Sequence, residues 1–87
     1  MSVKLYALST CPYCRMTKKF LQEGGVEFEL IEVDTMEGDT KDPSTPKGGA
    51  VEDVRRLSGG ASFPVVIVGE EVIVGFNKKR IKELLGL

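Results

Sequence analysis

The chain has 87 residues, of which 41% are hydrophobic and 29% are charged, and its net charge is −1. These values predict one small globular domain, residues 1–87, and exclude a disordered chain. The net charge gives no general attraction to nucleic acid or to anionic lipid, and the sequence has no run of eighteen apolar residues, so we expect neither a nucleic-acid nor a membrane partner. Residues 1–4 lack an apolar signal region, and we therefore expect a cytoplasmic location.

The first third of the chain predicts a strand, a helix and a second strand. Residues 3–8 are apolar on both faces, which indicates a buried, central strand. Pro12 suits the first position of a helix, and Gly24 and Gly25 supply its stop signal. Residues 27–33 alternate for much of their length and predict a second strand, and a connection of this length implies a parallel crossover. The apolar stripe of the helix would consist of Met16, Phe20 and Leu21.

The middle of the chain is a predicted loop followed by a helix. Residues 34–49 combine glycines, prolines and acidic residues, and they predict a long, mobile surface loop with room for a brief helical turn. Residues 50–58 predict a helix that ends at Gly59 and Gly60. The buried face of this helix would consist of Ala50, Val51, Val54 and Leu57.

The last third predicts a hairpin and a final helix. Residues 65–68 and 72–75 are β-branched runs, and residues 69–71 between them would form the turn. Asn77 is the predicted N-cap of the last helix. The residues of this helix that would face inward are Ile81, Leu84 and Leu85. The predicted order of elements is therefore βαβ followed by αββα.

The only two cysteines, Cys11 and Cys14, lie at the junction of the first strand and the first helix. A C-x-x-C at such a junction is typical of thiol–disulfide exchange. A reducing compartment disfavours a purely structural disulfide between them. The pair is therefore the candidate reactive site.

The position of the helix predicts different roles for the two thiols. Cys11 would be the N-cap, where unpaired backbone N–H groups and the positive end of the helix dipole stabilise a thiolate, and the basic residues that follow add positive potential. Cys14 would lie one turn inside the helix, less exposed and less acidic. We therefore expect Cys11 to attack a disulfide and Cys14 to resolve the mixed disulfide that results. The basic residues in question are Arg15, Lys18 and Lys19.

Three motifs resemble the glutaredoxin family, and the resemblance covers nearly the whole chain. The sequence C-P-Y-C at residues 11–14 matches the dithiol glutaredoxin motif, residues 62–64 (S-F-P) stand in place of the family's proline loop, and residues 75–77 (G-F-N) stand at its glycine turn. The resemblance implies an α/β, thioredoxin-like fold with a four-stranded mixed sheet flanked by helices. It also implies a monomeric oxidoreductase without a bound cofactor, which reduces disulfide-containing proteins or glutathionylated thiols, with glutathione as a candidate co-substrate.

The same resemblance implies a substrate site around the cysteines. Pro64 would follow a cis peptide bond beside the nucleophile, so that the backbone of Phe63 could pair with an extended substrate, although a proline can also simply begin a strand. Tyr13 could pack against a substrate or cover apolar surface. The expected substrate-binding residues are Thr10, Pro12, Tyr13, Phe63, Pro64, Gly75, Phe76 and Asn77.

Other chemistries are excluded or left open by the residue types. Two cysteines and no histidine give a monomer no zinc site and no papain-like hydrolase site, so no metal-ligating residues are predicted. The glycine pairs lack the spacing of a dinucleotide fingerprint. A homodimer, however, could bind an iron–sulfur cluster through its thiolates, as some relatives of glutaredoxins do.

The reductant is left open as well. Glutathione-dependent members usually carry a basic residue where this chain has Leu8, and an acidic pair where it has Asn77, Lys78 and Lys79. The G-F at residues 75–76 is similar to redoxins that serve ribonucleotide reductase and are recharged by a flavoenzyme of the thioredoxin-reductase type.

Charge is unevenly distributed along the chain. Residues 27–42 carry seven acids and one base, and residues 78–83 carry four bases and one acid. These runs are either two solvated faces or a dipolar surface that steers a partner protein.

Overall fold

The computed structural model describes residues 2–60 and 62–87. Its elements follow the predicted order, βαβ and then αββα. They are β1 (Val3–Ala7), α1 (Pro12–Glu23), β2 (Glu29–Glu32), the short 3₁₀ helix η1 (Val33–Thr35), α2 (Pro46–Ser58), β3 (Val65–Val68), β4 (Glu71–Val74) and α3 (Lys78–Leu85). Within the described ranges, no helix is both long and apolar enough to cross a membrane.

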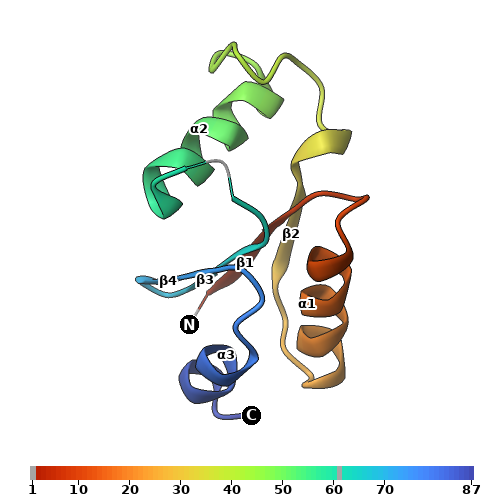
Figure 1. Cartoon of the computed structure of the whole chain (residues 1–87), viewed down its shortest axis with the longest axis vertical. Helices are drawn as coiled ribbons and strands as arrows, with labels where there is room; N and C mark the ends of the chain where they lie inside the picture. Colours follow the sequence, from red (N-terminus) through yellow and green to blue (C-terminus); the bar gives the residue numbers. More distant parts are fainter. Residues whose placement is uncertain (1, 61) are drawn as a thin grey trace.

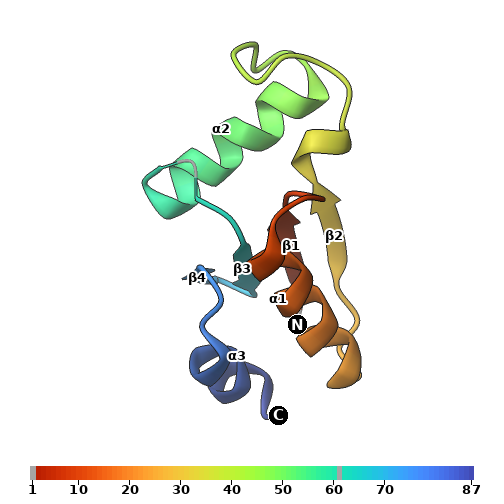
Figure 2. The ribbon, with the colours of Figure 1, turned by 45° about the vertical axis from the view of Figure 1, so that its right-hand side comes forward.

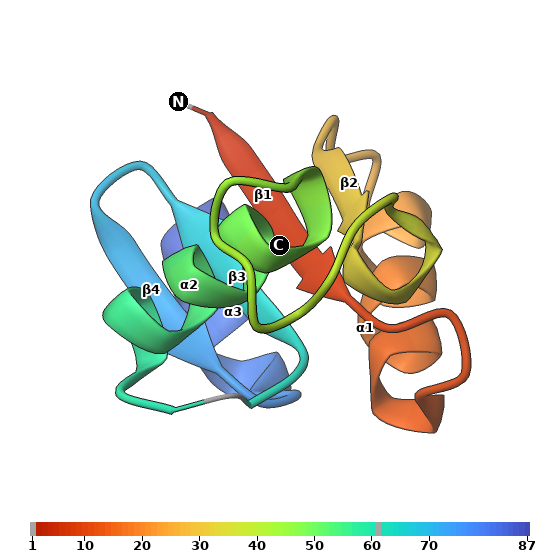
Figure 3. The same ribbon diagram turned by 90° about the horizontal axis from the view of Figure 1, so that it is seen from above.

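The four strands form one mixed sheet, as predicted, and the structure adds the strand order β2-β1-β3-β4. β1 pairs in parallel with β2 and antiparallel with β3, and β4 pairs antiparallel with β3. Figures 1 and 2 show the sheet between α2 and α3, and Figure 3 shows α2 in front of the strands when the molecule is viewed from above. The central position of β1 explains why the first strand is apolar on both faces.

Each face of the sheet has its own hydrophobic core. Leu5 and Ala7 of β1 face a core closed by Leu21 of α1 and Ile81 of α3, whereas Tyr6 faces a second core closed by α2. Because Leu5, Leu21 and Ile81 are fully buried, each stabilises the fold by about 1.5–3 kcal/mol. Helix α1, which follows Cys11, and the last helix α3 thus share one face of the sheet.

The buried face of α1 differs from the predicted one at one residue. Leu21 is buried and Phe20 is half-buried, as expected, but Met16 is 49% exposed. The buried face instead runs through Cys14, Thr17 and Leu21, which are spaced three and four residues apart. The sequence did not indicate this face because Thr17 is polar. Thr17 can nevertheless be buried, since its hydroxyl donates a hydrogen bond to the carbonyl of Tyr13 at 2.8 Å.

The second helix begins four residues before the predicted start, so the predicted loop over residues 34–49 is too long. Thr45 is the N-cap, with its hydroxyl accepting from the N–H of Gly48 at 3.2 Å, and Pro46 takes the first helical position. Gly48 and Gly49 in the first turn made this segment resemble a loop. Val33 also leaves the predicted second strand and begins η1. The remaining loop, residues 36–45, lies on the surface, with residues 37–44 exposed, and is held together by internal hydrogen bonds.

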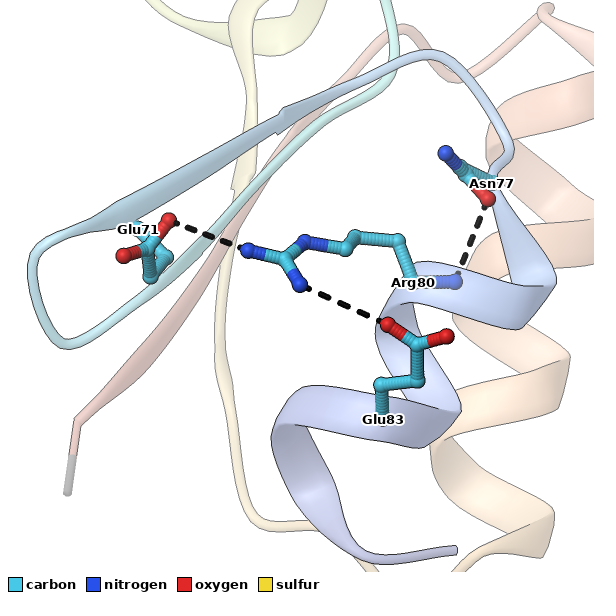
Figure 4. A network of polar contacts seen from close by, with 4 residues as sticks. All are labelled: Glu71, Asn77, Arg80 and Glu83. Atoms are coloured by element: carbon cyan, nitrogen blue, oxygen red, sulfur yellow. Dashed lines mark hydrogen bonds and ion pairs between the residues drawn. The ribbon is translucent and has the colours of Figure 1, made fainter.

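An ion pair connects the last helix, α3, to the hairpin formed by β3 and β4. The turn is shorter than predicted, because Val68 pairs with Glu71 and β4 begins there. Asn77 caps α3 as predicted, its side-chain oxygen accepting from the N–H of Arg80 at 3.1 Å. The Arg80 guanidinium lies between carboxylates of Glu71 on β4 and Glu83 on α3, at 3.5 and 3.4 Å (Figure 4). These contacts fix the start of α3 next to the glycine turn.

Candidate active site

Cys11 is the N-cap of α1, in the position that the sequence predicts. Its backbone is extended (φ −83°, ψ 120°), and its sulfur accepts from the N–H of Cys14 at 3.4 Å. Pro12 follows at the first helical position, where its missing N–H leaves no donor unsatisfied. The reactive candidate therefore lies where unpaired N–H groups of the first turn converge.

Cys14 lies one turn further and is only 2% exposed. Its sulfur accepts from the N–H of Leu8 at 3.5 Å, and its side chain belongs to the core beneath α1 and α3. Both cysteines are free thiols, so the structure represents the reduced form. One sulfur of the pair is accessible and the other is enclosed.

The surroundings shift the pKa values of the two thiols in opposite directions. Burial, together with the side-chain hydrogen bond to Cys11, raises the pKa of Cys14 to about 12. At Cys11 burial also opposes the thiolate, but hydrogen bonds from the Cys14 side chain and from the N–H groups of Cys14 and Tyr13 outweigh it, so the pKa of Cys11 is lowered. Of the two thiols, Cys11 therefore loses its proton first, and Cys14 keeps its proton to higher pH.

This separation predicts the pH dependence of alkylation. Iodoacetamide should modify Cys11 of the reduced protein with an apparent pKa below that of an ordinary cysteine, because the thiolate reacts and its pKa is lowered. Cys14 should stay unmodified in the folded protein until the pH approaches its pKa of about 12. Fragmentation mass spectrometry distinguishes the two positions, and the urea-unfolded protein is the control, in which both should react alike. Faster labelling of Cys14 at neutral pH would contradict the assignment.

The predicted proline loop and glycine turn lie side by side. The Phe63–Pro64 peptide bond is cis, as expected, and Pro64 is buried. The carbonyl of Pro64 accepts from the N–H of Gly75 at 2.8 Å, and Gly75 has a φ of +81°, which favours glycine. Among residues 2–60 and 62–87, the N–H and C=O of Phe63 have no hydrogen-bond partner.

The other predicted site residues divide into two groups. Cys11, Phe63 and Phe76 are partly buried, and all three pack against the hydrophobic core to which Cys14 belongs. Tyr13 is 62% exposed, and Thr10 and Pro12 are also exposed beside Cys11. The side chain of Asn77 is occupied by capping α3.

Sequence reasoning missed Asp34, which accepts hydrogen bonds from Ser9 in the loop before Cys11. Its two carboxylate oxygens accept from the N–H and the hydroxyl of Ser9, at 2.8 and 2.5 Å. These hydrogen bonds lower the pKa of Asp34, and its charge is one of the smaller causes that raise the pKa of Cys14. The Nε–H group of Arg15 donates to the carbonyl of Ser9 at 3.3 Å, so Ser9 is held by Asp34 and by Arg15. The available signal was the parallel pairing of the first two strands, because their carboxyl ends meet at one edge of the sheet.

A cavity of about 300 Å³ beside the site was also missed. Leu8 and Phe63 contribute to its apolar lining, and Lys47 and Arg55 of α2 contribute cationic groups. The sequence separates these residues by up to 55 positions, and the true start of α2 at Pro46 is what places Lys47 there. Asp34 adds a carboxylate to the same lining, so the cavity has an excess of one positive charge, which favours a small molecule that combines an apolar part with an anionic group.

Known proteins are similar to this chain over almost its whole length. The family model described as Glutaredoxin matches residues 3–73. An uncharacterized glutaredoxin-like 8.6 kDa protein in the rubredoxin operon of Clostridium pasteurianum is 32% identical, over 95% of this chain and 96% of the relative. The glutaredoxin-like protein NrdH of Salmonella typhimurium is 29% identical, over 97% of this chain and 89% of the relative. The crystal structure of Methanosarcina acetivorans methanoredoxin has a TM-score of 0.87 at 40% identity, covering 99% of this chain and 85% of that one.

Proposed function

The chain belongs to the glutaredoxin family of thiol–disulfide oxidoreductases, and we propose that it reduces protein disulfides or mixed disulfides of glutathione, with Cys11 as the nucleophile and Cys14 as the resolving cysteine. The observation that carries this proposal is the opposite shift of the two pKa values at the start of α1. The lowered pKa gives Cys11 a larger thiolate fraction than an ordinary cysteine has, and the raised pKa keeps the Cys14 sulfur protonated until Cys11 has reacted.

The proposed reaction transfers two electrons in two exchanges. The Cys11 thiolate attacks one sulfur of the substrate disulfide, that S–S bond breaks, and the departing thiolate takes up a proton. Cys14 then loses its proton and attacks the Cys11 sulfur, which releases the second substrate thiol and leaves a Cys11–Cys14 disulfide. Because Cys14 is one helical turn away, this second step is intramolecular and benefits from a high effective concentration. The reaction needs no bound cofactor.

The substrate would lie against the proline loop. Phe63 offers an N–H and a C=O without partners among the described residues, which suits pairing with an extended segment of a substrate protein. Tyr13 and Phe76 would border this segment, one exposed beside Cys11 and one next to the glycine turn. Within this proposal the protein works as a monomer in the cytoplasm.

The cavity near Leu8 supports glutathione as a co-substrate, whereas the charges at the start of α3 disfavour it. Leu8 replaces the basic residue that family members usually carry, but Lys47 and Arg55 line the same cavity as Leu8 and could attract a carboxylate there. At the start of α3, Lys78 and Lys79 stand where an ammonium group would have to bind, and they would repel it. The relatedness to NrdH therefore supports a second candidate, an electron donor to ribonucleotide reductase that is recharged by a flavoenzyme.

The two candidates differ in the source of electrons. Turnover of a small mixed disulfide is to be measured with glutathione plus glutathione reductase, and turnover of a disulfide protein with a thioredoxin-reductase system, each coupled to NADPH oxidation. Glutathione-driven turnover that weakens in a Lys47→Ala variant, through a higher KM for glutathione, supports the first candidate. Turnover only with the flavoenzyme supports the second. Failure of both systems, with a protein whose two thiols still titrate, would overturn the proposed reduction.

A further inference from the structure

The outer face of α1 carries an apolar stripe that leads away from the nucleophile. Tyr13 is 62% exposed and Met16 is 49% exposed, and the half-buried Phe20 follows one turn later. Their spacing of three and four residues places them on one face of the helix. The stripe begins two residues after Cys11, so a protein that presents a disulfide to Cys11 would also meet this face.

The start of α3 completes the stripe at its far end. The ring of Phe76 meets that of Phe20 edge to face, with centroids 6.2 Å apart, and the ammonium group of Lys78 lies 5.5 Å from the centre of the Phe20 ring. The hydrogen bond from the N–H of Gly75 to the carbonyl of Pro64 joins the glycine turn, residues 75–77, to the proline loop. The far end of the stripe is therefore linked through Phe76 and Gly75 to the loop proposed to bind the substrate.

The charge around the stripe is strongly positive. Helices α1 and α3 together carry seven basic and two acidic side chains, a net charge of +5, so the rest of the chain, whose total is −1, carries −6. Of the seven cations, only Lys19 and Arg80 take part in ion pairs among the described residues. The lysines of α3 without an ion pair among the described residues are Lys78, Lys79 and Lys82, of which Lys78 contacts Phe20. Arg15 and Lys18 lie on another side of α1, where they line a cavity with Leu30 and Glu32 of β2.

We propose that the face formed by Tyr13, Met16, Phe20 and Lys78 is the docking surface for a protein whose reducible disulfide is flanked by acidic residues and an apolar side chain. This inference rests on the proposed disulfide reduction and names the class of its partner. An apolar side chain of the partner covers Met16, while its carboxylates meet the uncompensated lysines of α3. Opposite charges accelerate encounter and orient the partner, and this acceleration falls with ionic strength.

Single-turnover reduction of designed peptides tests the surface without any reductase. Three peptides share a disulfide loop and a flanking leucine, and differ only in having acidic, neutral or basic flanks. The pre-reduced protein, in excess, should reduce the acidic peptide about tenfold faster than the basic one at an ionic strength of ~0.02 M, and this ratio should approach one at ~0.5 M.

Two charge-reversed variants provide the matched comparison. Lys78→Glu should lower the ratio between acidic and basic peptides several-fold, whereas Lys41→Glu, the same change on the exposed loop 36–45, should leave it as in the wild type. Met16→Ser should slow the acidic peptide without changing its salt dependence. Equal rates for the acidic and basic peptides, or equal effects of the two lysine variants, would overturn the docking surface. Failure to reduce even the neutral peptide would overturn the proposed function as well.

Discussion

Replacing Cys11 by Ser should lower the rate of disulfide reduction by on the order of 10³-fold or more, because a serine hydroxyl is not ionised at neutral pH and cannot attack a disulfide. The N-cap should survive, since serine is itself a favoured N-cap residue, so the free energy of unfolding should change little. The measurement is single-turnover reduction of a disulfide peptide, together with urea unfolding.

The matched variant is Cys14→Ser. It retains the nucleophile, so it should still consume one equivalent of disulfide and then stop, because no thiol remains to release the mixed disulfide. A Cys11→Ser protein with the activity of the wild type would show that the assignment of roles is wrong. If either variant lost activity only because it unfolds, its urea unfolding curve would show the lower stability.

Replacing Gly48 by Ala should lower the free energy of unfolding by about 3 kcal/mol. A Cβ atom at this residue would stand 1.8 Å from the carbonyl oxygen of Asp42, which is part of the backbone and has no flexible end to move aside. Loop 36–45 would have to shift, and with it the cap that Thr45 gives to α2. For a domain of this size such a loss is a large part of the total stability.

The neighbouring Gly49 is the control for this substitution. A Cβ there would approach only the Pro43 carbonyl, at 3.4 Å, so Gly49→Ala should be neutral or should stabilise the helix by up to about 1 kcal/mol. Urea unfolding of both variants gives the two midpoints. Similar midpoints for Gly48→Ala and Gly49→Ala would contradict the close approach of loop 36–45 to α2.

The features that were predictable from sequence are local ones. The start of α1 at Pro12 and the caps at Cys11 and Asn77 depend on a few consecutive residues, and the structure places them as expected. The glycine stops are local in the same way, since Gly59 adopts the left-handed conformation that ends α2. The higher acidity of Cys11 was predictable from its place at the helix end, and the lower acidity of Cys14 from its burial one turn inside the helix.

The features that were missed depend on distant contacts or on mixed signals. Asp34 meets Ser9 across 25 positions, and only the parallel pairing of β1 with β2 brings them together. Thr45 and Pro46 form a start signal like that of α1, but the glycines after them weakened it, since glycine disfavours a helix in isolation. Here the packing of Gly48 against Asp42 decides the structure.

Met16 illustrates a third kind of error. An apolar residue at helical spacing indicates a buried face, yet on α1 the polar Thr17 is fully buried and Met16 is half-exposed. The hydroxyl of Thr17 has a partner in its own helix, so its burial costs little, and the exposed methionine remains for a role at the surface.

The central claim is that Cys11 attacks and Cys14 resolves, and trapping of the mixed disulfide tests it most directly. The Cys14→Ser variant is incubated with a disulfide peptide at neutral pH and analysed, without added thiol, by fragmentation mass spectrometry, with Cys11→Ser treated in parallel. The account predicts one peptide bound to Cys11 in the first variant and no adduct in the second, in which the remaining thiol is buried and burial raises its pKa. An adduct on Cys14 that forms as fast as, or faster than, the adduct on Cys11 would contradict it.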